Sequence, residues 1–159
     1  MDKKTRQKIC SWGKEVRESI LDIISDYDEL EYHFSSDDLT GACGLSSFAL
    51  HKKLKSENIP SQINIGKWKT SPGEHVWITY DDTRFKKIID VTATQFSLKK
   101  EVHITNINNK NYIYYDPQPA LKIHLSMWDL QNPYLYNIEW DGDYCKIDLT
   151  KHGKTLLRK

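Results

Sequence analysis

The spacing of apolar residues changes once along this chain, from the period of a helix to that of a β-strand, at about residue 60. Within residues 5–27 apolar side chains recur three and four positions apart, which is the pattern of an amphipathic helix. These side chains are Val16, Ile20, Ile23 and Ile24. A second helix is expected over residues 43–58. It ends before Pro60, because proline lacks the backbone N–H that another turn requires.

Strand-like alternation follows Pro60. The predicted strands are 62–69, 75–80 and 85–91, with further candidates at 102–104, 112–115 and 144–149. Residues 121–139 show no pattern that decides their structure. Helices followed by a strand meander indicate an α+β fold, with the N-terminal helices packed on one face of an antiparallel sheet. A chain of 159 residues has the size of one domain, so we expect a single domain over 1–159.

Charge and hydropathy argue against two classes of partner. Lys and Arg together number 23 against 22 Asp and Glu, which gives a net charge of +1, and the basic residues are scattered rather than gathered in a stripe. Nucleic acid is therefore not an expected partner. No run of apolar residues is long enough for a transmembrane helix, so a membrane is not expected either.

Cysteine usage and the N-terminus bear on the compartment. Cys10, Cys43 and Cys145 are odd in number and show no paired spacing, which predicts free thiols in a reducing environment. The sequence Gly-Lys-Glu at 13–15 interrupts the apolar segment that a signal peptide needs. We expect a cytoplasmic protein, or one delivered out of the cell by a secretion system that does not read a signal peptide.

Cys43 is the candidate nucleophile. It stands at the predicted start of the second helix, between Gly41 and Gly44, and it precedes the apolar face of that helix. A cysteine within an apolar face is usually an inert hydrophobic residue. At a helix N-terminus, by contrast, the partial charge of about +0.5 favours a thiolate over a thiol.

His75 and Asp90 complete the pattern that a thiol nucleophile needs. His75 follows Cys43 by 32 residues and heads a predicted strand, and Asp90 follows His75 by 15 residues, in the next strand along the chain. A buried carboxylate costs several kcal/mol unless it is paired, and His75 is the expected partner. In such a set the histidine takes the thiol proton and the aspartate orients the imidazole.

Two further residues are candidates for the same site. The candidate oxyanion donors are the backbone N–H of Cys43 and a second donor from residues 35–40. Gln95 is a further candidate, as an oxyanion donor or a substrate contact; alternatively, Gln95 is a structural amide in a turn. Trp77 either lines a substrate groove or fills the core, and core packing is favoured. Cys, His and Asp also bind zinc, but no fourth ligand stands at short spacing, so neither a metal nor a cofactor is expected.

These segments resemble the Cys-His-Asp enzymes of the papain-like and transglutaminase-like superfamily. The resemblance covers about residues 37–96 and rests on Thr-Gly-Ala-Cys-Gly-Leu-Ser-Ser at 40–47, Glu-His-Val-Trp at 74–77 and Ile-Asp-Val-Thr-Ala-Thr-Gln-Phe at 89–96. It implies a papain-like fold with Cys43 as nucleophile, His75 as base and Asp90 as orienting acid. The residue order and short spacing are also similar to the compact glutamine deamidases among bacterial toxins and effectors.

The expected function is a cysteine-dependent amide hydrolase or acyltransferase, and the resemblance favours deamidation of a glutamine side chain in a protein. Gly44-Leu45 follows the cysteine where many papain-type peptidases carry a tryptophan, which argues against an endopeptidase. Cysteine peptidase and transglutaminase activities share the mechanism and stay open. A non-catalytic binding module that retains the fold is the alternative of another class. The expected partners are a protein or peptide substrate and, for a toxin, a cognate inhibitor or immunity protein.

Overall fold

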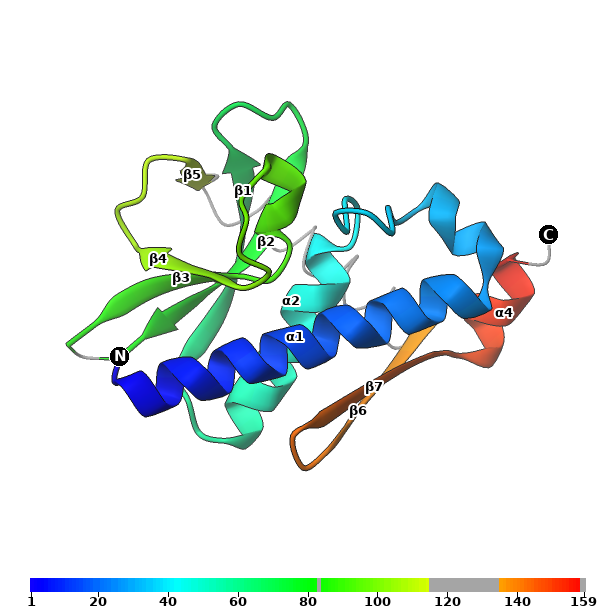
Figure 1. Cartoon of the computed structure of the whole chain (residues 1–159), viewed down its shortest axis with the longest axis horizontal. Helices are drawn as coiled ribbons and strands as arrows, with labels where there is room; N and C mark the ends of the chain where they lie inside the picture. Colours follow the sequence, from blue (N-terminus) through cyan, green and yellow to red (C-terminus); the bar gives the residue numbers. More distant parts are fainter. Residues whose placement is uncertain (83, 115–134, 158–159) are drawn as a thin grey trace.

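The computed structural model describes residues 1–82, 84–114 and 135–157, with side chains up to residue 155. Within these ranges the protein has the expected α+β architecture (Figure 1). The helical segments are α1 (Lys3–Asp26), a short 3₁₀ helix η1 (Asp28–Tyr32), α2 (Cys43–Ser56), a second 3₁₀ helix η2 (Ala93–Phe96) and α4 (Lys151–Leu157). Both long helices match the predicted ranges within two residues at each end. None of the helices in the described part of the chain has the length and hydropathy that a bilayer-spanning helix needs.

Five strands form an antiparallel sheet with the order β4-β3-β2-β1-β5. They are β1 (Ser61–Trp68), β2 (Glu74–Asp81), β3 (Lys86–Asp90), β4 (His103–Asn106) and β5 (Tyr112–Tyr114). The first four run as a meander, so each pairs with its neighbour in sequence, and β5 returns to the free edge of β1. β2 is therefore an interior strand, flanked by β1 and β3.

A separate hairpin of β6 (Tyr136–Asp141) and β7 (Tyr144–Leu149) packs against α1. α1 and α2 lie between this hairpin and the five-stranded sheet, since α1 contacts β7 and α2 contacts β1 and β2 (Figure 1). The backbone N–H of Ile147 donates to Ser19 of α1 at 2.8 Å, and the Trp140 indole donates to the carbonyl of Ala49 in α2 at 3.0 Å. The strand predicted over 144–149 is present. β6 falls partly within the undecided stretch 121–139, of which residues 121–134 lie outside the described residues.

Both faces of β2 are covered. The face toward the helices contributes Ile78 to the main core, which also contains Val16 and Leu50. The opposite face carries an aromatic cluster that includes Trp77 and Tyr112. All six side chains from His75 to Tyr80 are consequently buried. A histidine on this strand is held in a dry, packed environment.

The loop before α2 has an unusual backbone. Gly41 adopts a φ of +92°, and a Cβ at this position would collide with the backbone carbonyl of His33. Leu39, also with positive φ, is 1% exposed and anchors the loop in the core. Glycine accepts such a conformation at no steric cost. The loop therefore delivers the chain to Cys43 along a path that only glycine permits at position 41.

Candidate active site

Cys43 is the first residue of α2 and is 8% exposed. The preceding residue, Ala42, provides no side-chain cap, and the helical hydrogen bonds begin with the N–H of Ser46 donating to the carbonyl of Ala42. Within the described part of the chain, the N–H groups of Cys43, Gly44 and Leu45 have no hydrogen-bond partner. These donors and the helix dipole create a positive potential next to the thiol.

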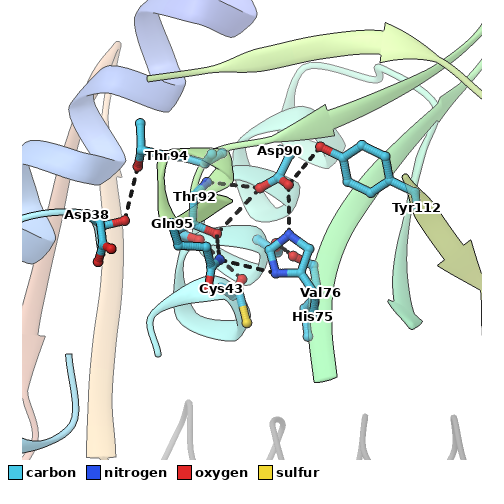
Figure 2. A network of polar contacts seen from close by, with 12 residues as sticks. Asp38, Cys43, His75, Val76, Asp90, Thr92, Thr94, Gln95 and Tyr112 are labelled. Atoms are coloured by element: carbon cyan, nitrogen blue, oxygen red, sulfur yellow. Dashed lines mark hydrogen bonds and ion pairs between the residues drawn. The ribbon is translucent and has the colours of Figure 1, made fainter. Parts of the chain in front are cut away.

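His75 and Asp90 form a buried pair. The imidazole Nε2 lies 2.7 Å from Oδ2 of Asp90, and each side chain is 1% exposed (Figure 2). The register of β2 and β3, in which Ile78 pairs with Ile89, places both side chains on one face of the sheet. The hairpin predicted to join the two strands therefore brings histidine and aspartate into contact, as the spacing indicated.

Asp90 accepts hydrogen bonds at both of its oxygens. Oδ2 accepts from His75 and from the hydroxyl of Tyr112 at 2.9 Å, while Oδ1 accepts from the backbone N–H of Thr92 at 3.0 Å and from its hydroxyl at 3.4 Å. Burial alone would raise the pKa of Asp90, but the attraction to His75 and these hydrogen bonds lower it below the ordinary 3.8. Asp90 is therefore a carboxylate with a fixed orientation.

The charge state of His75 depends on the same contacts. Burial disfavours the imidazolium, yet the Asp90 carboxylate and hydrogen bonding to Asp90 and Cys43 outweigh it and raise the pKa of His75 from 6.5 to about 10. Because Nε2 is occupied by Asp90, the nitrogen that remains for Cys43 is Nδ1. The ring is thus oriented by the carboxylate on one side and presents its other nitrogen to the thiol.

Gln95 lies at this second nitrogen. Its side-chain Nε2 is 3.2 Å from Nδ1 of His75 and 3.1 Å from the hydroxyl of Thr92 (Figure 2). Gln95 belongs to η2, which begins three residues after Asp90, so the same stretch of chain supplies the carboxylate and the amide. Gln95 therefore belongs to the candidate site, whereas the described polar groups of residues 35–40 bond within their own loop and to Thr94.

Arg17 anchors this stretch to α1. Its guanidinium is buried, and it donates to the carbonyl of Val91 at 2.7 Å and to the hydroxyl of Thr94 at 3.2 Å. The Thr94 hydroxyl in turn donates to the carbonyl of Asp38 at 3.0 Å, in the loop that precedes Cys43 (Figure 2). One buried cation thus connects the first helix, the segment that carries Gln95 and the loop that leads to Cys43.

Trp77 occupies the core. It is 0% exposed and packs edge-on against Tyr112 and Tyr114, with ring centroids 5.2 and 5.1 Å away. A side chain without exposed surface cannot line an open groove, so the substrate-lining interpretation of Trp77 is wrong. The Trp77 ring stacks against the His75 ring at a centroid distance of 5.8 Å, so it helps to hold the imidazole in place.

Tyr112 and Arg17 are site residues that the sequence did not reveal. Tyr112 lies on β5, three strands away from β3 in the sheet order, and reaches Asp90 only because the sheet curls. Arg17 lies next to Val16 in an amphipathic helix, where an arginine is normally solvated. The position of Arg17 among the buried residues of α1 is the sequence signal that could have indicated its role. No local pattern indicates a role for Tyr112.

Among the described residues, no group of three or more His, Cys, Asp or Glu side chains is arranged to hold a metal ion. Comparison with protein-family models, with curated protein sequences and with solved structures finds no match. The geometry of Cys43, His75, Asp90 and Gln95 is therefore the basis for the function proposed below.

Proposed function

We propose that this protein is a cysteine-dependent amide hydrolase of the papain-like and transglutaminase-like type, which deamidates a glutamine side chain of a protein substrate. The observation that carries the proposal is the buried His75–Asp90 pair, which leaves Nδ1 for Cys43 at a helix N-terminus. A hydrogen-bonded base fixed by a carboxylate beside a thiol is the arrangement required for nucleophilic catalysis.

Each residue has a defined role in the proposed reaction. The proton of the Cys43 thiol passes to Nδ1 of His75 before the attack, because the raised pKa of His75 favours the imidazolium beside a thiolate. Sγ then adds to the amide carbon, and the carbonyl electron pair moves to oxygen. The N–H of Cys43 and the amide of Gln95 are the candidate donors for this oxyanion. Collapse of the intermediate breaks the C–N bond as His75 returns the proton to the leaving ammonia. Water then attacks the thioester, with His75 again as base, and releases the glutamate carboxylate and the thiol.

The recessed position of the thiol favours a side-chain amide as substrate. Cys43 is 8% exposed, so a reacting carbonyl reaches Sγ only if a narrow chemical group carries it. A glutamine side chain has its amide at the end of two methylene groups and meets this requirement. A peptide bond, by contrast, must bring the backbone on both sides of the carbonyl to the sulfur. Binding energy for the glutamine would come from the folded surface around it.

The first experiment tests the nucleophile by brief, substoichiometric alkylation with iodoacetamide at neutral pH, followed by mass spectrometry. We expect the label on Cys43. Burial raises the pKa of the Cys145 thiol to about 12, and Cys10 lies half-buried on α1 away from a base-carboxylate pair. Equal labelling of all three thiols would contradict the proposed role of Cys43.

The second experiment tests the reaction. Candidate protein substrates are incubated with the enzyme, and ammonia release and intact mass are measured together. We expect ammonia and the mass gain of replacing an amide NH₂ by OH. Both should be absent with Cys43→Ala and present with Cys10→Ala as the matched control. Backbone fragments that depend on Cys43, without ammonia, would instead identify a cysteine peptidase, and a cross-linked product with ammonia would identify a transglutaminase.

A further inference from the structure

The Asp90 oxygen that orients His75 is shared with a second donor. Oδ2 accepts from Nε2 of His75 at 2.7 Å and from the hydroxyl of Tyr112 at 2.9 Å (Figure 2). A carboxylate oxygen has two lone pairs, so these two donors fill Oδ2. Oδ1 is occupied in the same way by the backbone N–H and the hydroxyl of Thr92. The imidazole therefore holds one of four positions on a fully hydrogen-bonded carboxylate.

Tyr112 is fixed as a donor and lies away from the thiol. It is 4% exposed, and its ring packs edge-on against Trp68 and Trp77, with ring centroids 5.1 and 5.2 Å away. Burial and the neighbouring Asp90 carboxylate raise the pKa of the phenol, so the hydroxyl keeps its proton. Tyr112 consequently acts on the reaction through Asp90 and not through contact with a substrate.

Gly66 on β1 allows β5 to lie where Tyr112 reaches the carboxylate. Gly66 pairs with Tyr114, two residues after Tyr112. A Cβ at position 66 would collide with the carbonyl of Ile113 and would lie 2.6 Å from the Trp77 ring. The absence of a side chain at Gly66 therefore permits the close approach of β5 to β1 and to the ring beneath it.

Two donors on one oxygen weaken each other, because each withdraws electron density that the other uses. The Tyr112 hydroxyl stabilises the charge of Asp90 and at the same time reduces the attraction of Oδ2 for the imidazolium of His75. In the proposed reaction this imidazolium must give the proton on Nδ1 to the leaving amine. A proton that is held too tightly is transferred slowly, since an acid is most effective when its pKa lies near the working pH.

Other charged and titratable groups also act on the His75–Asp90 pair. They are Cys43 of α2, Arg17 of α1 and His103 of β4. Tyr112 of β5 differs from these three because it donates directly to the oxygen that His75 uses. Its removal changes that oxygen and leaves the other groups in place.

We propose that Tyr112 is a positioning residue that shares Oδ2 of Asp90 with His75, so that the imidazolium proton is held loosely enough to pass to the leaving group. This inference rests on the proposed function, because it takes Cys43 as the nucleophile and His75 as the acid that protonates the amine. It makes β5, at the far edge of the sheet from β4, a part of the catalytic apparatus.

The first test measures the hydrogen bond itself by ¹H NMR of the ¹⁵N-labelled full-length protein. The proton on Nε2 of His75 is buried, so its exchange with water is slow. In Tyr112→Phe its resonance should move downfield, because Oδ2 then accepts from His75 alone. Tyr144→Phe, at a tyrosine that is 71% exposed, is the matched control and should leave the resonance in place.

A second variant changes the donor in the opposite direction. Replacement of Tyr112 by 3,5-difluorotyrosine through codon suppression keeps the hydroxyl and makes it a stronger donor, so the resonance should move upfield. This variant also serves if Tyr112→Phe does not fold. Opposite shifts in the two variants support the proposal. An upfield shift in Tyr112→Phe would overturn it in favour of a purely structural contact that holds Asp90 in place, and unchanged resonances in both variants would overturn it outright.

The second test measures proton transfer to a leaving group. Two aryl acetates acylate Cys43 by the same step, in which Sγ bonds to the acetyl carbon, the C–O bond breaks and the aryl oxide leaves. p-Nitrophenoxide leaves without a proton, whereas p-methoxyphenoxide is a strong base that takes the proton from Nδ1 of His75.

In Tyr112→Phe the rate with p-nitrophenyl acetate should be unchanged. The rate with p-methoxyphenyl acetate should be roughly three- to tenfold lower, because a hydrogen bond contributes about one power of ten and part of it reaches the imidazole. An equal fall in both rates would show that the imidazole has lost its orientation and would overturn the proposal, as would two unchanged rates.

The role of Tyr112 and the proposed function fail in different ways. If iodoacetamide selects Cys43 in the wild-type protein and Tyr112→Phe changes neither the His75 resonance nor the acylation rates, the role of Tyr112 is rejected and the nucleophile stands. If iodoacetamide labels Cys10, Cys43 and Cys145 equally, the nucleophile itself is rejected.

Discussion

Removal of the Tyr112 hydroxyl isolates one of the contacts that hold the Asp90 carboxylate. In Tyr112→Phe the donor at 2.9 Å from Oδ2 is lost, while the bonds from His75 and Thr92 remain. Hydrogen bonds to charged groups contribute about 1.5–3 kcal/mol, and Tyr112 is 4% exposed, so water does not replace the lost donor. We expect the free energy of unfolding to fall by about 2 kcal/mol, because Asp90 keeps its other partners.

The assay is urea and thermal unfolding of the purified variant. For a chain of this length about 2 kcal/mol corresponds to a Tm that is about 4–8 °C lower. Tyr144→Phe is the matched control, since this tyrosine is 71% exposed and the change should stay within about 0.5 kcal/mol. An unchanged Tm in Tyr112→Phe would refute the contribution of the hydroxyl.

The same variant has a distinctive pH dependence. Tyr112 contributes to lowering the pKa of Asp90, so the stabilisation is present above the ordinary value of 3.8 and is lost as the pH falls through the lowered pKa of the folded protein. The difference in unfolding free energy between wild type and Tyr112→Phe should therefore narrow at acid pH. A difference that is independent of pH would show that the hydroxyl contributes through packing and not through the carboxylate charge.

Three further changes test other parts of the structure. Asp90→Asn should preserve the fold but reduce turnover by about 10⁴-fold, because an amide no longer selects the productive tautomer of His75; normal turnover, measured by ammonia release, would contradict this role. The raised pKa of His75 makes its stabilising contribution complete below pH 6.5 and lost as the pH rises toward about 10, so the stability difference between wild type and His75→Gln should shrink over this range in urea titrations. Gly41→Ala should lower the unfolding free energy by more than 1 kcal/mol, since its Cβ meets the His33 carbonyl at positive φ, and a neutral effect in calorimetry would contradict that geometry.

The parts of the site that the sequence predicted are those set by local periodicity. The start of α2 at Cys43 follows from the glycines around the cysteine and the apolar face behind it. The meeting of His75 with Asp90 follows from two adjacent strands joined by one short hairpin, whose register is fixed once both strands have a buried face.

The remaining features depend on interactions that local periodicity does not encode. Tyr112 reaches Asp90 because the whole sheet curls. The 22 residues between these two positions contain no pattern that predicts this curl. The two bonds of the Gln95 amide depend on the backbone path of η2. That path is in turn held by Arg17 of α1, which lies 74 residues before Val91 in the sequence. For the same reason the sequence does not predict β6. This strand is stabilised by pairing with β7, in a hairpin that packs on α1, and its own residues show no strand pattern.

The bond from Arg17 to Val91 joins positions 74 residues apart and crosses from the helix layer to the edge of the site. Regions tied by such buried contacts tend to open as one cooperative unit, because separating them exposes an unpaired charge. Local opening of α1 and loss of the His75–Asp90–Gln95 geometry should thus be the same subglobal event. Amide hydrogens of α1 and of residues 91–96 should exchange with a common free energy. A small molecule attached to Cys43 would then slow hydrogen exchange in the first helix, so the state of the site could be monitored in a helix that carries neither Cys43, His75 nor Asp90.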